Sequence, residues 1–178
     1  MIKERPSPSI LQVLFIAALS FVAIAFTVIT INTGDILWFW PVFDEMPERI
    51  TIHCYGNDIV VNPGDPAYAL VNSVINESLS GTKRWDSLSM SEVTYGDYQT
   101  SSTMMVLELG YNPPVPLHSF YKFFKSFDVL VIPLDGRHAS VNSVFGRLRG
   151  RTLAGSMHVE TTATVLATLK EQALCQKP

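Results

Sequence analysis

The chain has 178 residues, with 13 Lys and Arg against 16 Asp and Glu, and its net charge is −3. Residues 48–178 alone hold eleven basic and twelve acidic side chains, a balance of −1, so this part has no general electrostatic attraction for nucleic acid. Val, Ile, Leu and aromatic residues recur throughout, which argues against a disordered chain. We therefore expect a folded protein that is not a nucleic-acid partner.

The first feature along the chain is an uncharged run of 23 residues, Ser9–Ile31. At about 1.5 Å per residue, a helix of this length spans the roughly 30 Å hydrocarbon core of a bilayer. We expect an uncleaved signal-anchor at residues 9–31, which makes the bilayer itself a partner, and a short stub at residues 1–8. A cleaved signal peptide is the competing interpretation, but its apolar core would be only about 7–15 residues long.

Charge asymmetry across this run predicts its orientation. Lys3 and Arg5 precede the run and are opposed only by Glu4. The segment after the run is acidic instead, with Asp35, Asp44, Glu45 and Glu48. Because basic flanks stay on the cytoplasmic side, we expect the stub in the cytoplasm and the rest of the chain outside, as a single-pass protein of the cell membrane.

Residues 32–47 are expected to form an aromatic juxtamembrane segment and linker. Its aromatic side chains are Trp38, Phe39, Trp40 and Phe43. Trp favours the membrane–water interface, where the ring is half buried and the indole N–H stays hydrated. We expect these four residues at the outer surface of the bilayer. There they either pack against the following domain or form a docking patch for a neighbouring membrane protein.

Residues 48–178 are expected to form one extracytoplasmic domain. Apolar and polar residues alternate over Arg49–Tyr55, which predicts a half-buried strand, and Ile59–Val61 reads as the second strand of a hairpin. Asp65 and Pro66 are typical of a helix start, and apolar residues at helical spacing follow as far as Leu79. The domain therefore begins as a hairpin followed by a helix.

The middle of the domain gives one clear strand between two weak regions. Residues 85–98 suggest broken extended structure, whereas Met104–Tyr111 predicts a strand. Three prolines in residues 112–116 remove donors and should exclude a central strand or a helix there. Residues 117–126 fit either a helix or a strand. Phe127–Leu134 is the strongest predicted strand because it is a continuous run of largely β-branched and apolar residues.

The last part of the domain predicts three short strands and a helix. The strands are Val141–Phe145, Arg147–Arg151 and Leu153–Val159, and the helix covers Thr161–Leu174. Neighbouring strands with short connections pair antiparallel. We therefore expect an α+β fold, in which a mainly antiparallel sheet and two helices on one of its faces form two layers.

Arg147, Arg149 and Arg151 alternate along the predicted strand, and this is the strongest candidate binding surface. If the strand is continuous, all three guanidinium groups line one face, where they could meet anionic headgroups or an acidic partner. The alternative is an edge strand whose charges prevent aggregation, paired with nearby carboxylates.

Cys54 lies near the start of the domain and Cys175 near its end. Two cysteines in an oxidising compartment are able to form a disulfide. Sequence does not give their distance, so a pair of small buried thiols is the alternative.

The sequence gives little support for a catalytic function. The four histidines form no ligand motif, and there is no Gly-rich phosphate loop, so neither a metal nor a cofactor is expected. Ser156 precedes His158 by two residues, which is a weak signal for a serine hydrolase because no orienting carboxylate accompanies them. We therefore expect a non-enzymatic, membrane-anchored binding or interaction module. The alternative is an accessory subunit held by another membrane protein.

Overall fold

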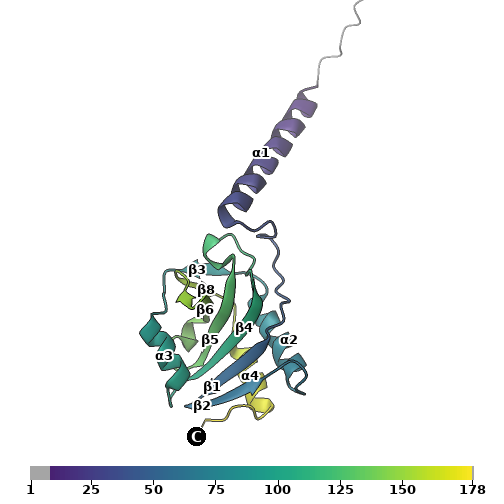
Figure 1. Ribbon diagram of the computed structural model, residues 1–178. Coiled ribbons are helices and arrows are strands. Elements are labelled where there is room, and N and C mark those ends of the chain that lie inside the picture. The colour runs from purple at the N-terminus through teal and green to yellow at the C-terminus, as the bar shows by residue number, and fades with distance from the viewer. Residues whose placement is uncertain (1–8, 178) are drawn as a thin grey trace, which may run out of the picture.

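The computed structural model describes residues 9–177, so the expected stub at residues 1–8 lies outside the described residues. Helix α1 (Ile10–Thr33) leaves one end of an α+β domain, and the last residues of the chain lie at the opposite end (Figure 1). Ser9 caps α1, because its hydroxyl accepts a hydrogen bond from the backbone N–H of Gln12 at 3.3 Å. Among the described residues, α1 is the one helix long and apolar enough to cross a membrane.

The sheet has eight strands, and every recorded pair is antiparallel, as expected. Its order is β2-β1-β4-β5-β6-β8-β3, and β7 pairs with β6. The strands are β1 (Arg49–Cys54), β2 (Asn57–Val61), β3 (Arg84–Asp86), β4 (Met105–Val115), β5 (Phe127–Asp135), β6 (Ser143–Leu148), β7 (Arg151–Thr152) and β8 (Ser156–His158). The predicted hairpin is confirmed by the pairing of β1 with β2.

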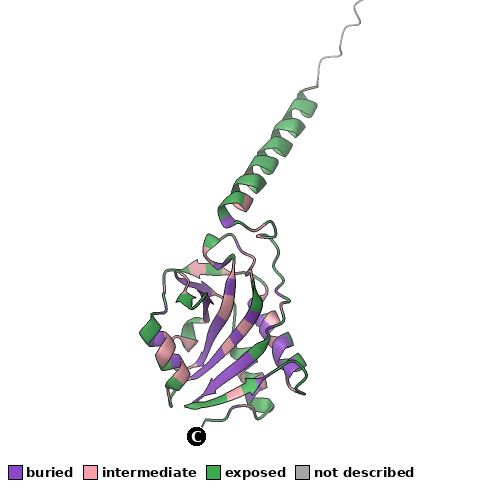
Figure 2. Cartoon of the chain, viewed as in Figure 1, coloured by how far each residue is buried: buried purple, intermediate pink, exposed green. Residues whose placement is uncertain are grey.

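Helices α2 (Tyr68–Leu79) and α4 (Ala163–Glu171) cover one face of the sheet, on the right in Figure 1. The main core lies between them and the strands, and α1 by contrast is exposed along most of its length (Figure 2). Ile50, Ile52 and Leu107 are fully buried here, because side chains at every second strand position point to the helices. Burial of these apolar side chains is the main stabilising term of the domain.

Helix α3 (Glu92–Thr100) covers the other face, on the left in Figure 1. A second buried cluster lies under it: Met90, Tyr98, Val106, Val131 and Phe145. The two expected helices, α2 and α4, therefore share one face as predicted, but α3 adds a third layer, so the expectation of two layers is wrong (Figure 1). The expectation of broken extended structure over residues 85–98 is also wrong, because only β3 is extended there. Ser91 starts α3 by accepting a hydrogen bond from the backbone N–H of Thr94 at 3.0 Å.

Strand β4 continues through the prolines, so the prediction that residues 112–116 are excluded from a central strand is also wrong. Gly110 pairs with Val129, and the next pair is Val115 with Phe127. The intervening residues bulge out of the ladder, so the prolines need no strand donors. Residues 117–126 form neither of the expected elements, apart from the 3₁₀ turn η1 (Lys122–Phe124). A second 3₁₀ turn, η2 (Ala139–Val141), precedes β6.

Cys54 and Cys175 are joined by a disulfide, with their Cα atoms 5.7 Å apart. Cys54 ends β1, and Cys175 follows α4. The bond therefore ties the first strand to the last part of the described chain, at the end of the domain away from α1 (Figure 1).

Candidate functional site

The junction between α1 and the domain is built on a contact between residues far apart in sequence. Asp35 follows the left-handed Gly34 that ends α1, and His118 lies in the loop after β4. His118 Nδ1 lies 2.8 Å from Asp35 Oδ2, with side-chain exposures of only 15% and 10%. A buried hydrogen bond to a carboxylate is strong, so this contact fixes the chain after α1 against the domain.

Trp38 folds back onto α1 and also contacts the domain. Its indole N–H donates to the Thr30 hydroxyl at 3.2 Å, and its ring centroid lies 6.0 Å from that of Phe26. On the domain side, the ring centroid of Phe120 is 4.5 Å away. Trp38 thus packs between the helix and the domain, whereas the side chains of Phe39 and Trp40 remain about half exposed, at 51% and 48%.

Phe43 does not lie with the other aromatic residues of its segment. It is only 3% exposed, and its ring packs at 6.3 Å from Tyr111 and 6.5 Å from Phe127. Its backbone N–H donates to the Ser80 hydroxyl at 2.9 Å. The expectation that Phe43 lies at a membrane surface is therefore wrong, because this residue anchors the linker in the core.

A pocket of about 170 Å³, which we call the junction pocket, opens beside these contacts. Three segments line it: residues 38–41, residues 81–83 and residues 118–120. Its walls are mainly apolar and include four Trp and Phe rings, and its polar groups include Lys83 and His118. Such a site combines apolar walls with a few placed polar groups, which is the usual composition of a small-ligand pocket.

Lys83 is the cation of the junction pocket. Its ammonium group donates to the backbone carbonyl oxygens of Pro41 at 3.0 Å and Gly81 at 3.3 Å. No carboxylate of the described residues lies within ion-pair distance of it. Burial lowers the pKa of Lys83 to about 8, so the group is still mostly charged at neutral pH. Carbonyl dipoles hold this charge without neutralising it.

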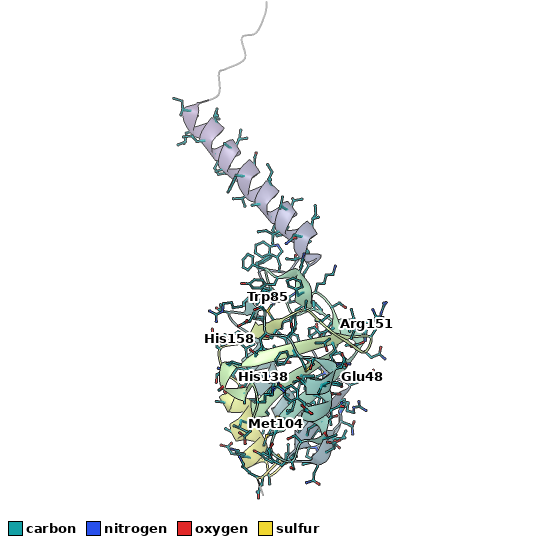
Figure 3. The ribbon with its side chains drawn as sticks, turned by 90° about the vertical axis from the view of Figure 1, so that its left-hand side faces the viewer. Glu48, Trp85, Met104, His138, Arg151 and His158 are labelled. Carbon is teal, nitrogen blue, oxygen red and sulfur yellow. A yellow bond between two sulfur atoms is a disulfide. The ribbon has the colours of Figure 1, made fainter. Side chains whose placement is uncertain are left out.

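Two more lysines lie near the end of α1. Lys125 runs alongside Gly34, where a Cβ atom on that glycine would lie 3.3 Å from the lysine Cδ. Lys122 lies in η1, which contacts α1, and the neighbouring Phe123 stacks on Trp85 at 5.0 Å. Figure 3 shows Trp85 at the end of the domain nearest α1. Cations here complement the negative C-terminal end of the helix dipole.

The three arginines do not form the expected row, because their segment is a tight hairpin and not a continuous strand. Arg147 pairs with Thr152 across it, and Arg149 and Gly150 occupy the turn with φ values of 51° and 76°. Arg147 is buried, with its guanidinium 3.8 Å from the Tyr95 ring centroid. It also pairs with Glu92 at 2.9 Å. Arg149 and Arg151 are exposed, so at most these two are free to bind a partner.

A polar network that the sequence analysis missed lies under α3. His53 Nδ1 is 2.7 Å from Asp58, and its other ring nitrogen is 3.7 Å from Glu108. Tyr95 and Gln99 of α3 donate to the same Glu108 oxygen at 2.8 and 3.4 Å. Burial opposes a charged His53, but the two carboxylates outweigh it and raise the pKa of His53. Alternation in β1 predicted only that His53 faces away from Ile52.

Ser156 and His158 are not arranged as a catalytic pair. Ser156 is fully buried, and its hydroxyl has no hydrogen-bond partner among the described residues. His158 Nδ1 instead lies 2.7 Å from the backbone carbonyl oxygen of Val141. In the described part of the chain, no group of three or more His, Cys, Asp or Glu side chains is arranged to hold a metal ion.

The junction pocket is thus the best-formed candidate site, and it joins residues flagged by composition, such as Trp38 and Trp40, with residues that gave no signal, such as Lys83. For His118 the sequence predicts no role, because the four histidines form no ligand motif. No family model, no curated protein and no solved structure gives a significant match to the chain. A function is therefore inferred from the geometry of the site alone.

Proposed function

We propose that the chain is a single-pass, membrane-anchored binding module, non-enzymatic, whose domain lies outside the cell against the bilayer. The length and apolar character of α1 support the anchor. The basic flank at Lys3 and Arg5 supports the orientation. A disulfide between Cys54 and Cys175 is in keeping with an oxidising compartment.

The contacts between α1 and the domain are the main support for this proposal. A flexible tether would leave the domain free to tumble above the membrane, but the Asp35–His118 contact and the Trp38–Phe120 contact join α1 to the domain from two sides. The domain therefore keeps one end, with the junction pocket, turned to the bilayer surface. A module built in this way binds a ligand or partner that is itself at the membrane.

An accessory subunit of a membrane complex is the second candidate, and an exposed apolar collar supports it. The collar consists of side chains that are 42–64% exposed: Ile36, Leu37, Phe39, Trp40, Val42 and Phe120. Apolar patches of this kind mark contacts with a membrane or with another protein.

Two experiments test the proposal. Protease added to intact cells should digest the domain, whereas protection until the cells are lysed would reverse the orientation. Purification in mild detergent then separates the two candidates. A membrane protein recovered in stoichiometric amount favours the subunit, and its loss on changing Phe39 and Trp40 to Ser would place the contact at the collar. Recovery of the chain alone favours the independent module.

A further inference from the structure

We propose that the junction pocket binds the phosphate of an anionic phospholipid headgroup, with Lys83 as its principal ligand. This inference rests on the proposed function, because it requires the pocket to face the bilayer. Three features support it: the height of the pocket, the unneutralised charge within it and the basic side chains near the end of α1.

The pocket lies at headgroup height. The 24 residues of α1 form a helix about 36 Å long, whereas the hydrocarbon core is roughly 30 Å thick. The end of α1 and the segment after Gly34 therefore lie in the polar layer, which is about 5–8 Å deep on each side. Trp38 donates its indole N–H to Thr30, so the pocket wall is held within about one helical turn of this level.

The chemistry of Lys83 fits a phosphate. An ammonium group has three N–H donors, and two of them reach the carbonyls of Pro41 and Gly81. One donor and a net positive charge remain for a ligand. His118 uses Nδ1 on Asp35, and its other ring nitrogen has no partner among the described residues. The aromatic rings would contact the glycerol and upper acyl carbons.

The surrounding charge favours an anionic lipid over a zwitterionic one. Lys122 and Lys125 are both exposed and belong to the loop that contacts α1. Of the carboxylates near the junction, Asp35 is already bound to His118. Glu160 lies against Gly81, where a Cβ atom would be 3.4 Å from its Oε1, but it is not within ion-pair distance of Lys83. A quaternary ammonium would meet Lys83 inside the aromatic walls, and like charges repel there. Phosphatidylglycerol supplies phosphate without a second cation.

The test uses the full chain in a neutral mild detergent and the fluorescence of its three tryptophans. Trp38 and Trp40 line the pocket, and Trp85 lies at the end of the domain nearest α1 (Figure 3). Dihexanoyl phosphatidylglycerol, dihexanoyl phosphatidylcholine and inorganic phosphate are titrated separately. We expect saturable binding of phosphatidylglycerol and binding of phosphatidylcholine that is weaker by about tenfold or more, because the choline cation would meet Lys83 inside the pocket. Inorganic phosphate should bind still more weakly, because it lacks the glycerol and acyl carbons that would contact the aromatic rings.

The decisive variant is Lys83→Met, which keeps the aliphatic stem and removes the charge. It should weaken phosphatidylglycerol binding about tenfold or more, whereas Lys83→Arg should retain most of it. Lys170→Met, at an exposed position on α4, is the matched control and should bind like the unmodified protein. If Lys83→Met does not fold, the double variant Lys122→Gln/Lys125→Gln, at two exposed positions, is the deciding test. Its affinity for phosphatidylglycerol should be lower than that of the unmodified protein, and the difference should be greater at low salt than at high salt.

Unchanged binding in Lys83→Met, or in the double variant when it is the deciding one, overturns the inference. So does equal affinity for phosphatidylcholine, or inorganic phosphate binding as tightly as the lipid, which would make the pocket a site for the free anion. The proposed function fails separately. Protease protection in intact cells would place the domain on the cytoplasmic side and overturn the proposed function, even if the detergent titration succeeded. Conversely, if the domain is outside but the lysine variants bind phosphatidylglycerol normally, the lipid site fails while the anchor and orientation are unaffected.

Discussion

Asp35 and His118 are 83 positions apart in sequence, yet the carboxylate oxygen and the imidazole nitrogen lie 2.8 Å apart at the base of α1. One residue belongs to the end of the helix and the other to the domain. Both are largely buried. The pair thus holds the start of the segment after α1 against the domain, because both side chains are largely shielded from water.

The first prediction concerns this pair. Asp35→Ala leaves His118 without its partner in a largely buried position, which should weaken the junction by about 1–3 kcal/mol. Limited proteolysis should then cut residues 34–42 faster, while the thermal midpoint of the domain changes little. Asp44→Ala, which removes an exposed acid from the same linker, is the control. Equal cutting rates in the two variants would mean that the pair does not hold the junction.

The second prediction concerns the disulfide. Cys54 and Cys175 are separated by 121 positions, and closing so long a loop in the unfolded chain gives about 4–5 kcal/mol of stabilisation as a model-dependent upper value. Urea unfolding of Cys54→Ala/Cys175→Ala should show a loss of up to this size. Mass spectrometry of the protein purified without reductant should find the two half-cystines linked, and two free thiols would contradict the prediction.

The third prediction separates the arginines. Arg147→Met should lower the free energy of unfolding by about 2–3 kcal/mol, because a buried guanidinium loses its contact with the Tyr95 ring and its hydrogen bonds. Arg149→Gln/Arg151→Gln should change it by less than about 0.5 kcal/mol, since both side chains are exposed. Urea titration followed by circular dichroism measures both values. Similar losses in the two variants would restore the idea of three equivalent arginines.

The fourth prediction concerns the pH dependence that His53 and Glu108 give to the stability of the domain. Burial opposes charge on His53, but Glu108 and Asp58 outweigh it and raise its pKa above 6.5 in the folded state. The stability that His53 contributes is therefore complete below about pH 6.5 and is lost as the pH rises through the folded-state pKa. Burial also opposes charge on Glu108, but His53 and Tyr95 outweigh it and lower its pKa below 4.5. Its contribution is present above about pH 4.5 and is lost as the pH falls through the folded-state pKa.

Chemical unfolding measured between pH 4 and pH 9 tests this expectation. The stability of the unmodified protein minus that of His53→Gln isolates the contribution of His53, because burial lowers the pKa of His138 and of Lys83 and gives those groups the opposite pH dependence. This difference should be largest below about pH 6.5 and should decline as the pH rises through the folded-state pKa of His53. A difference that does not change with pH would mean that His53 does not contribute to the pH dependence.

The sequence predicted those helices and strands in which the spacing of apolar residues matches the residues that are buried. Ile50 and Ile52 alternate with polar neighbours, and the β1–β2 hairpin formed as expected. Helix α3 escaped prediction because only Thr94 and Tyr98 of its residues are buried, and Val93 is 75% exposed. So narrow an apolar stripe is too weak to distinguish a helix from an irregular segment.

Only the residues of the candidate site that stand out by their type could be predicted from the sequence. The aromatic run flagged Trp38 and Trp40, because tryptophan has a physical preference for interfaces. Lys83 gave no signal, since a lone lysine is ordinarily a solvated side chain and its burial is created by segments far along the chain. The arginine row failed for the converse reason. Period-two spacing was read through Gly150, whose left-handed conformation turns the chain back on itself.

The region next to the end of α1 is acidic in the unfolded chain, whereas in the folded protein it also carries lysines. The machinery that inserts a membrane protein meets an unfolded polypeptide, and the stretch it meets after α1, residues 35–48, is acidic. Folding then engages Asp35 with His118. It also brings Lys83 into the junction pocket and Lys122 and Lys125 near the end of α1, all from later in the chain. In the proposed topology, the information that sets orientation and the information that sets lipid contact are therefore stored in different residues, so each can change by mutation without altering the other.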